Sequence, residues 1–102
     1  MNGFKQDKLE IELLSREYIK NKMIIEDVLE KGIKYPKERF KSSHTIVNRI
    51  ENALKILDED DRLIIQKELI EGERGYWYLE YFSSSTYYRH RDRAYENFLH
   101  CL

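Results

Sequence analysis

The sequence predicts an all-α protein of about five helices. Apolar residues recur at intervals of three, four and seven along most of the chain, which is the spacing of one helix face. Breaks are few, because Pro36 is the only proline and there are four glycines in 102 residues. Serine clusters precede two of the apolar stretches, and serine is a preferred residue at helix N-termini. The length suits a single domain spanning residues 1–102.

The charge balance limits the classes of partner. The chain has 18 basic and 19 acidic residues, so binding to a polyanion has to rest on local clusters. The lone Cys101 excludes an internal disulfide and fits a reducing compartment. No apolar run is long enough to span a membrane, and the first residues lack the apolar core of a signal peptide. We therefore expect a cytoplasmic protein without membrane contact.

The first element predicted is a long amphipathic helix within residues 4–31, ended by Gly32. It either packs over the C-terminal helices or serves as a dimerisation or partner-docking helix. Its predicted apolar stripe consists of Ile11, Leu14, Tyr18, Ile25 and Val28, widened by Leu13, Ile24 and Leu29.

A linker is predicted at residues 32–41, because Pro36 favours an extended Tyr35. Four basic residues and two aromatic rings alternate here. This segment is either a basic arm that reaches a phosphate backbone or a solvated loop with Tyr35 and Phe40 tucked under a helix.

Two helices are predicted between residues 42 and 72. Ser42 and Ser43 are interpreted as the cap of a helix to Leu57, whose apolar residues are Ile46, Val47, Ile50, Ala53, Leu54 and Leu57. The four acids Asp58–Asp61 are interpreted as the first turn of the next helix, since helix N-termini stabilise negative charge. That helix continues through an apolar run and ends near Gly72.

The aromatic segment from Glu73 to Phe82 has room for one short helix. Tyr76, Trp77 and Tyr78 are the candidate partner-binding residues, because exposed tyrosine and tryptophan suit a binding surface. The alternative is that these rings pack against the N-terminal helix.

The last predicted helix follows Ser83–Ser85 and would be capped by Ser84 or Ser85. Its packing stripe is Tyr87, Ala94, Tyr95, Phe98 and Leu102. Arg89, Arg91 and Arg93 exceed Asp92 and Glu96 by one charge. The candidate DNA-binding residues are Ser84, Ser85, Thr86, Tyr88, Arg89 and Arg93.

A short helix, a tight turn and a second helix form a helix-turn-helix, so a long N-terminal helix packed on a C-terminal helix-turn-helix (residues 42–102) is expected. The pattern Leu57-x4-Arg62-x-Ile64-Ile65, an aromatic near Tyr76, and Ser83-x-Ser85-Thr86-Tyr87-Tyr88-Arg89-x4-Ala94-x3-Phe98 resembles the RinA/ArpU-type regulators of phage late genes. These, like related small proteins of Gram-positive bacteria and mollicutes, resemble region 4 of bacterial sigma factors.

The resemblance covers roughly residues 57–98. It implies a transcriptional regulator whose Ser85, Thr86, Tyr88, Arg89 and Arg93 face duplex DNA, with Tyr87, Ala94 and Phe98 holding the helix. The sequence departs from the usual motif in having Trp77, Tyr78 and Tyr81 where a small residue and a turn glycine are common. Because the charge surplus is small, a homodimer or a contact to RNA polymerase would have to add affinity.

The alternative function is a protein-binding adaptor that docks on RNA polymerase or another partner through its aromatic segment. A contiguous positive surface formed by Arg89, Arg93 and the linker lysines would favour DNA binding. An apolar patch around Trp77 would favour the adaptor.

The sequence gives little support for an enzyme. His44, His90, His100 and Cys101 lack the spacing of a metal site or of a nucleophile with its base. A glycine-rich phosphate loop is missing, and the acids at 58–61 lack the spacing of a calcium loop. No cofactor and no metal are expected.

Overall fold

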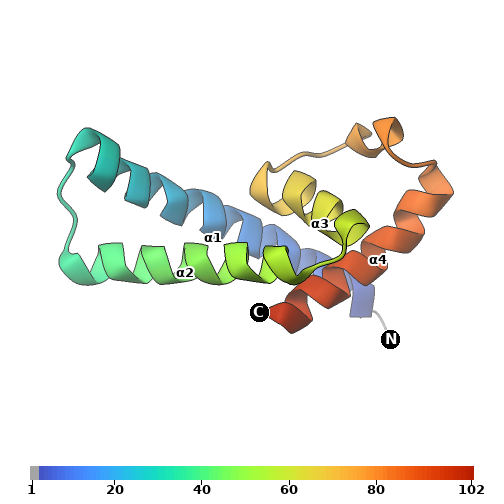
Figure 1. The fold of residues 1–102 in the computed structure, drawn as a ribbon, viewed down its shortest axis with the longest axis horizontal. Coiled ribbons are helices and arrows are strands. Elements are labelled where there is room, and N and C mark those ends of the chain that lie inside the picture. The colour runs from blue at the N-terminus through green and yellow to red at the C-terminus, as the bar shows by residue number, and fades with distance from the viewer. Residues whose placement is uncertain (1–2) are drawn as a thin grey trace.

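The computed structural model describes residues 3–102, and within that range the chain is helical without any strand (Figure 1). This confirms the all-α prediction. The elements in order are α1 (Gly3–Lys31), α2 (Lys37–Ile56), α3 (Glu59–Ile65), the π-helical turn η1 (Gln66–Ile70), the 3-10 turn η2 (Trp77–Glu80) and α4 (Ser84–Cys101).

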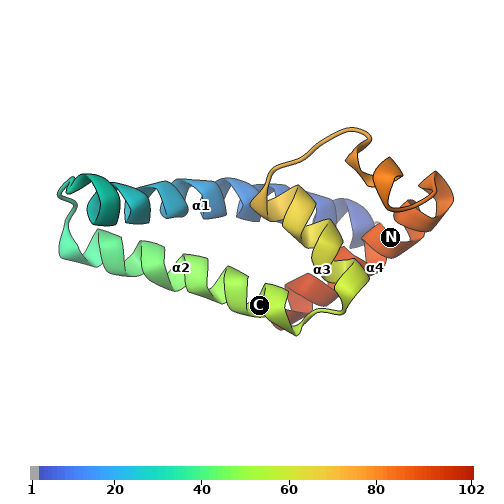
Figure 2. The ribbon, with the colours of Figure 1, turned by 45° about the horizontal axis from the view of Figure 1, so that its top comes forward.

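Helices α1 and α2 form a long antiparallel hairpin, seen side by side in Figures 1 and 2. Three polar contacts fix their register. Ser43 Oγ donates to Asn21 Oδ1 at 2.7 Å in the buried interface, and Tyr18 donates its hydroxyl to Glu51 at 2.7 Å. Lys22 Nζ lies 3.4 Å from the same Glu51 carboxylate. The hairpin is thus held by specific hydrogen bonds as well as by its apolar stripe.

The loop between these helices is shorter than predicted. α2 begins at Lys37, so the predicted linker 32–41 was wrong for its second half. The carbonyl of Pro36 accepts the amides of Arg39 and Phe40 at 3.0 and 3.1 Å, which starts the helix six residues before Ser43. Ser43 is not a cap, because its side chain is buried within the helix against Asn21.

The second half of the chain packs across one end of the hairpin. α3 continues into η1 and lies against α4, while α1 contacts both η1 and α4. Ser15 of α1 donates to the carbonyl of Leu69 at 2.7 Å, and Arg62 donates to the carbonyl of Leu57 at 2.7 Å across the α2–α3 corner. The buried apolar core is Ile11, Tyr18, Ile25, Val47, Ile50, Ala53, Leu57, Ile64, Ile65, Leu69, Tyr78, Tyr87, Ala94, Tyr95 and Phe98.

Most of the predicted stripe residues are buried or half-buried, but two positions on α1 differ. Leu13 and Leu29 are 57% and 68% exposed, so the prediction that they widen the stripe was wrong. Ile24, predicted in the same way, is buried. One face of α1 packs inward, and the opposite face carries exposed apolar side chains among charged ones.

Candidate nucleic-acid interface

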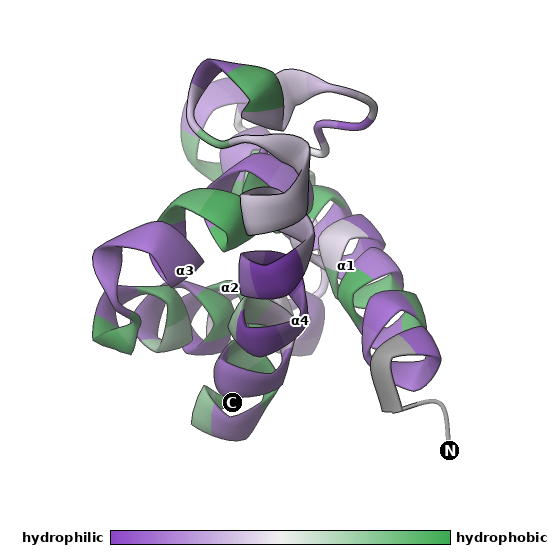
Figure 3. Cartoon of the chain, turned by 90° about the vertical axis from the view of Figure 1, so that its right-hand side faces the viewer, coloured by the Kyte–Doolittle hydropathy of each residue, from purple (hydrophilic) through white to green (hydrophobic). Residues whose placement is uncertain are grey.

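Helix α4 places its N-terminal half at the end of the molecule opposite the α1–α2 loop (Figure 1). Its inner face is anchored by Tyr87, Ala94, Tyr95 and Phe98, all buried. The other side of these first turns is exposed, and Figure 3 shows hydrophilic turns of α4 facing outward at this end. The prediction of one packed and one open face is confirmed.

The cap of α4 is Ser83, so the prediction of Ser84 or Ser85 as the cap was wrong. Ser83 has extended backbone angles, and its Oγ accepts the amide of Thr86 at 3.3 Å. Thr86 Oγ1 lies 2.9 Å from Ser83 Oγ and is half-buried. Capping one residue earlier leaves Ser84 and Ser85 as exposed residues of the first helical turn.

Four of the predicted DNA-binding side chains lie on the exposed surface of α4. Ser84, Ser85, Tyr88 and Arg89 are exposed, with Tyr88 at 47%. Tyr88 packs on the guanidinium of Arg91, whose carbon lies 4.8 Å from the ring centroid. Arg89 makes no ion pair within residues 3–102 at the distances of a salt bridge. It is therefore the predicted cation best placed for an external ligand.

Arg93 has a structural role that the sequence did not indicate. Its guanidinium lies 3.6 Å from Oδ1 of Asp61, a side chain only 1% exposed, while more than half of Arg93 itself is exposed. Asn97 donates to the other oxygen of Asp61 at 2.9 Å. Asp61 Oδ1 has no hydrogen-bond partner, so Arg93 provides the compensating charge for a buried carboxylate. Removing Arg93 is therefore expected to destabilise the fold.

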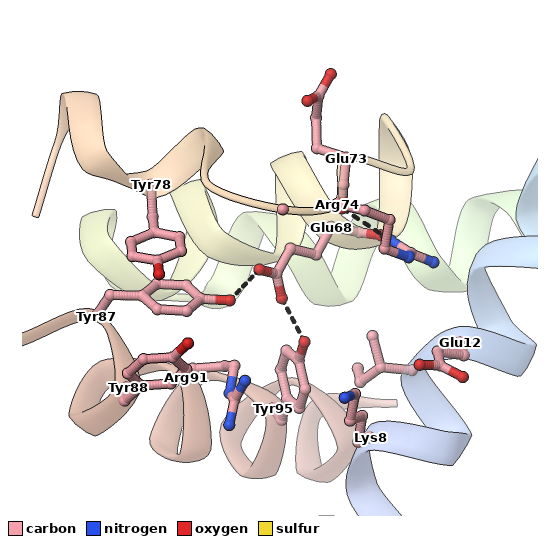
Figure 4. A pocket seen from close by; sticks show the side chains of 12 residues that line it. Lys8, Glu12, Glu68, Glu73, Arg74, Tyr78, Tyr87, Tyr88, Arg91 and Tyr95 are labelled. Carbon is pink, nitrogen blue, oxygen red and sulfur yellow. Dashed lines mark hydrogen bonds between the residues drawn. The ribbon is translucent and has the colours of Figure 1, made fainter. Parts of the chain in front are cut away.

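A buried carboxylate fixes α4 on the rest of the fold. Glu68, in the π-helical turn η1, accepts hydrogen bonds from the hydroxyls of Tyr87 and Tyr95 on α4 (Figure 4). It also accepts one from Trp77 Nε1 at 2.9 Å. Its side chain is 7% exposed. Burial raises the pKa of the Tyr87 and Tyr95 hydroxyls, and the nearby Glu68 carboxylate raises both further.

This carboxylate and its tyrosines border a cavity of about 150 Å³. The cavity lies between α4, η1, the loop that follows it and α1, as Figure 4 shows. Lys8, Glu12, Arg74 and Arg91 contribute charged groups of both signs to its wall. Because the wall carries charges of both signs, the cavity favours neither an anionic nor a cationic ligand.

The three predicted partner-binding residues behave differently from one another. Tyr76 is 75% exposed, Trp77 is half-buried with its N–H held by Glu68, and Tyr78 is only 3% exposed. Tyr78 stacks on Tyr87 with ring centroids 3.8 Å apart. The prediction of Tyr78 as a surface residue was wrong, because its ring is part of the core that supports α4.

The first helix of the predicted helix-turn-helix is a single 3-10 turn. Residues 77–80 form η2, and a three-residue turn leads from it to α4. The rings of Trp77 and Tyr78 pack against Tyr87 between this turn and α4. α3 is the longer helix that packs on α4.

The basic segment around Pro36 does not join the arginines of α4. It lies at the tip of the α1–α2 hairpin, whereas the N-terminus of α4 lies at the opposite end of a molecule 47 Å long (Figure 1). Tyr35 and Phe40 are half-buried, as the alternative of a tucked loop predicted. Apolar surface near Trp77 is present, since Tyr76, Leu79 and Tyr81 are all more than 48% exposed.

Sequence reasoning missed Asp61, Glu68 and Ser83. The sequence did contain a signal for the two acids, because each falls at helical spacing from Ile64 and Ile65 on the apolar face. An acid on such a face requires partners, and the tyrosines and the arginine of α4 supply them. Within residues 3–102 no group of three or more His, Cys, Asp and Glu is arranged to hold a metal ion.

None of the helices in residues 3–102 has the length and apolar character that a membrane crossing needs. Comparison of the chain with protein family models, with curated proteins and with solved structures finds no match.

Proposed function

We propose that the chain is a transcriptional regulator that binds duplex DNA through the exposed face of α4. The observation that carries this proposal is the capped and uncovered N-terminal half of that helix. It offers Ser84, Ser85, Tyr88 and Arg89 together on a surface that no other element of residues 3–102 covers. Hydroxyl groups and helix N-termini hold phosphates, and arginine binds phosphate or the edge of guanine.

The roles follow from position along the helix. Ser84 and Ser85 lie in the first turn, where hydroxyls and free amides contact a phosphate. Arg89 lies one turn further and reaches a base edge or the next phosphate. Arg93 is exposed at the margin and offers N–H donors there, although its charge is offset by Asp61.

This face alone supplies little electrostatic affinity, because Asp92 and Glu96 are exposed on α4 among the arginines. The proposal therefore includes a second contributor, either another copy of the chain or RNA polymerase. The sequence resemblance to RinA/ArpU-type regulators and sigma region 4 supports the same combination of a DNA-reading helix and a protein contact.

The test is the change of Arg89 to alanine. Arg89→Ala should weaken binding to a DNA duplex by about 1 to 3 kcal/mol and lower the salt slope of binding by about one if a phosphate contact is lost. Gel shifts at several salt concentrations measure both. Arg89 is a better position for this test than Arg93, because removing Arg93 would also leave the buried Asp61 without its counter-charge.

The matched control removes exposed positive charge far from α4. Lys34→Ala, in the exposed loop between α1 and α2, also removes one positive charge and should leave DNA binding within about twofold, because charges at opposite ends of the molecule are screened from each other. Equal loss in this control would mean that the DNA contact is not specific to α4. Unchanged binding by Arg89→Ala would contradict the proposal.

A second candidate is the protein-binding adaptor. It is favoured by the exposed apolar side chains of Tyr76, Leu79 and Tyr81 beside α4, and by the separation of the basic loop from Arg89. Complete absence of DNA binding by the unmodified chain at low salt would favour this function over the first.

A further inference from the structure

A groove runs along the second half of α1 to the loop that leads to α2. Its volume is about 590 Å³. Apolar side chains form its floor and cations stand at its edges. The lining residues are Arg16, Ile19, Lys20, Met23, Ile24, Asp27, Tyr35 and Arg39.

The floor exposes apolar surface in the middle of a charged helix. Ile19 and Met23 are 44% and 57% exposed, while Ile24 beneath them is 6% exposed. Met23 follows Ile19 by four residues on α1, and Ile24 comes directly after it. Tyr35, from the loop, lines the same groove. Such a surface is stabilised when another apolar surface covers it.

The cations at the edge are not neutralised by the chain. Arg16, Lys20 and Arg39 are exposed, and none of them makes an ion pair at salt-bridge distance within the described range. The one acid in the lining is already engaged. Asp27 accepts the hydroxyl of Tyr35 at 3.0 Å and lies 3.4 Å from Lys31 Nζ. The groove is therefore locally positive in a chain whose net charge is −1.

We propose that this groove binds an acidic amphipathic helix of a partner protein. Apolar side chains of that helix would cover Ile19 and Met23, and its carboxylates would pair with Arg16, Lys20 and Arg39. A second copy of the chain fits less well, because its α1 would bring the same cations against these. Duplex DNA would match the charge but leave the apolar floor uncovered. The inference stands independently of DNA binding by α4.

The probe is a fluorescein-labelled peptide of about 18 residues, long enough to form a helix. Leucines at helical spacing form one face and glutamates fill the rest. Fluorescence anisotropy should show this peptide binding about tenfold or more tightly than a scrambled peptide of the same composition. Because composition and net charge are matched, the difference reports the amphipathic face.

Charge reversal sharpens the test. Arg16→Glu with Lys20→Glu should abolish binding of the glutamate peptide and create binding of a lysine version of the same peptide. Met23→Gln should weaken the glutamate peptide about threefold to tenfold. Leu29→Gln, at an equally exposed leucine outside the groove, and Arg89→Ala on α4 should change it by less than twofold. All sites are exposed, and circular dichroism checks that each variant is folded.

Three results would overturn the inference. These are equal affinity for the scrambled peptide, failure of the charge-reversed variant to change its preference, and an effect of Leu29→Gln as large as that of Met23→Gln. Binding to phosphatidylglycerol vesicles that is tighter than peptide binding and lost in Arg16→Glu with Lys20→Glu would also refute a protein helix as the occupant, as would duplex binding that is lost in that variant and kept in Arg89→Ala. Loss of DNA binding in Arg89→Ala with intact peptide binding separates this inference from the proposed function.

Discussion

Phe98 is the largest fully buried side chain of the described residues, at 0% exposed. It lies on the inner face of α4 with Ala94, which is also fully buried, and the core around it includes Ile64 and Ile65 of α3. Because Ala94 is small, α3 can approach α4 closely at this position. Phe98, four residues further along α4, fills the space between the two helices. Phe98 is therefore a main apolar anchor of α4.

Changing Phe98 to alanine should lower the free energy of unfolding by about 3 to 5 kcal/mol, through lost burial and the cavity left behind. Urea denaturation followed by circular dichroism measures it. Tyr88→Ala removes an exposed ring from the same helix and should cost less than about 1 kcal/mol. A loss below 1 kcal/mol for Phe98→Ala would mean that α4 is not packed as described.

At the scale of elements, Glu68 connects three of them. It lies in the π-helical turn η1 and accepts hydrogen bonds from η2 through Trp77 and from α4 through Tyr87 and Tyr95. A π-helical turn in such a place is typical of a position where the backbone is adjusted to aim one side chain. The Glu68 carboxylate therefore holds η2 and α4 against η1, which continues α3.

Glu68→Leu should destabilise the fold by about 3 kcal/mol or more, because it leaves two buried tyrosine hydroxyls and the half-buried Trp77 N–H without an acceptor. The same change in a Tyr87→Phe, Tyr95→Phe background should cost clearly less, since two of those donors are already gone. Thermal and urea unfolding of the four proteins gives the coupling free energy. Additive losses would show that the hydrogen bonds contribute little.

The sequence predicts the helices well and their ends poorly. Periodic apolar residues located α1, α2, α3 and α4, because burying one face is the main force that forms them. The residue at which a helix begins depends on which of several polar groups accepts the free amides of its first turn. Pro36 starts α2 before Ser43, and Ser83 caps α4 ahead of its neighbours.

For the candidate site, the exposed positions Ser84, Ser85, Tyr88 and Arg89 were predictable from helical spacing. The burial of Tyr78 and the pairing of Arg93 with Asp61 were not. Both depend on contacts between residues far apart in the chain, which one-dimensional periodicity does not encode.

At the scale of the whole molecule, three buried or half-buried tyrosine hydroxyls predict sensitivity to alkali. Burial raises the pKa of Tyr18, Tyr87 and Tyr95, and hydrogen bonds to Glu51 or Glu68 raise it further. A pKa higher in the folded chain than in the unfolded one means that the folded chain holds its proton more tightly. The stability from this source is full below the unfolded pKa of about 10 and is lost as pH rises above it.

The free energy of unfolding should therefore fall from about pH 10 upward, as measured by urea titrations at fixed pH. Tyr87→Phe with Tyr95→Phe should show a shallower fall, because two of the three ionisable groups are absent. A parallel decline in both proteins would assign the alkaline loss to other groups.

The rod-like α1–α2 hairpin gives the molecule two ends, with the α4 tip at one and the groove by Tyr35 at the other. Under the two proposals made above, the chain would act as a spacer that brings an acidic protein to a nucleic acid. Such tethering raises the local concentration of the recruited protein without any conformational change.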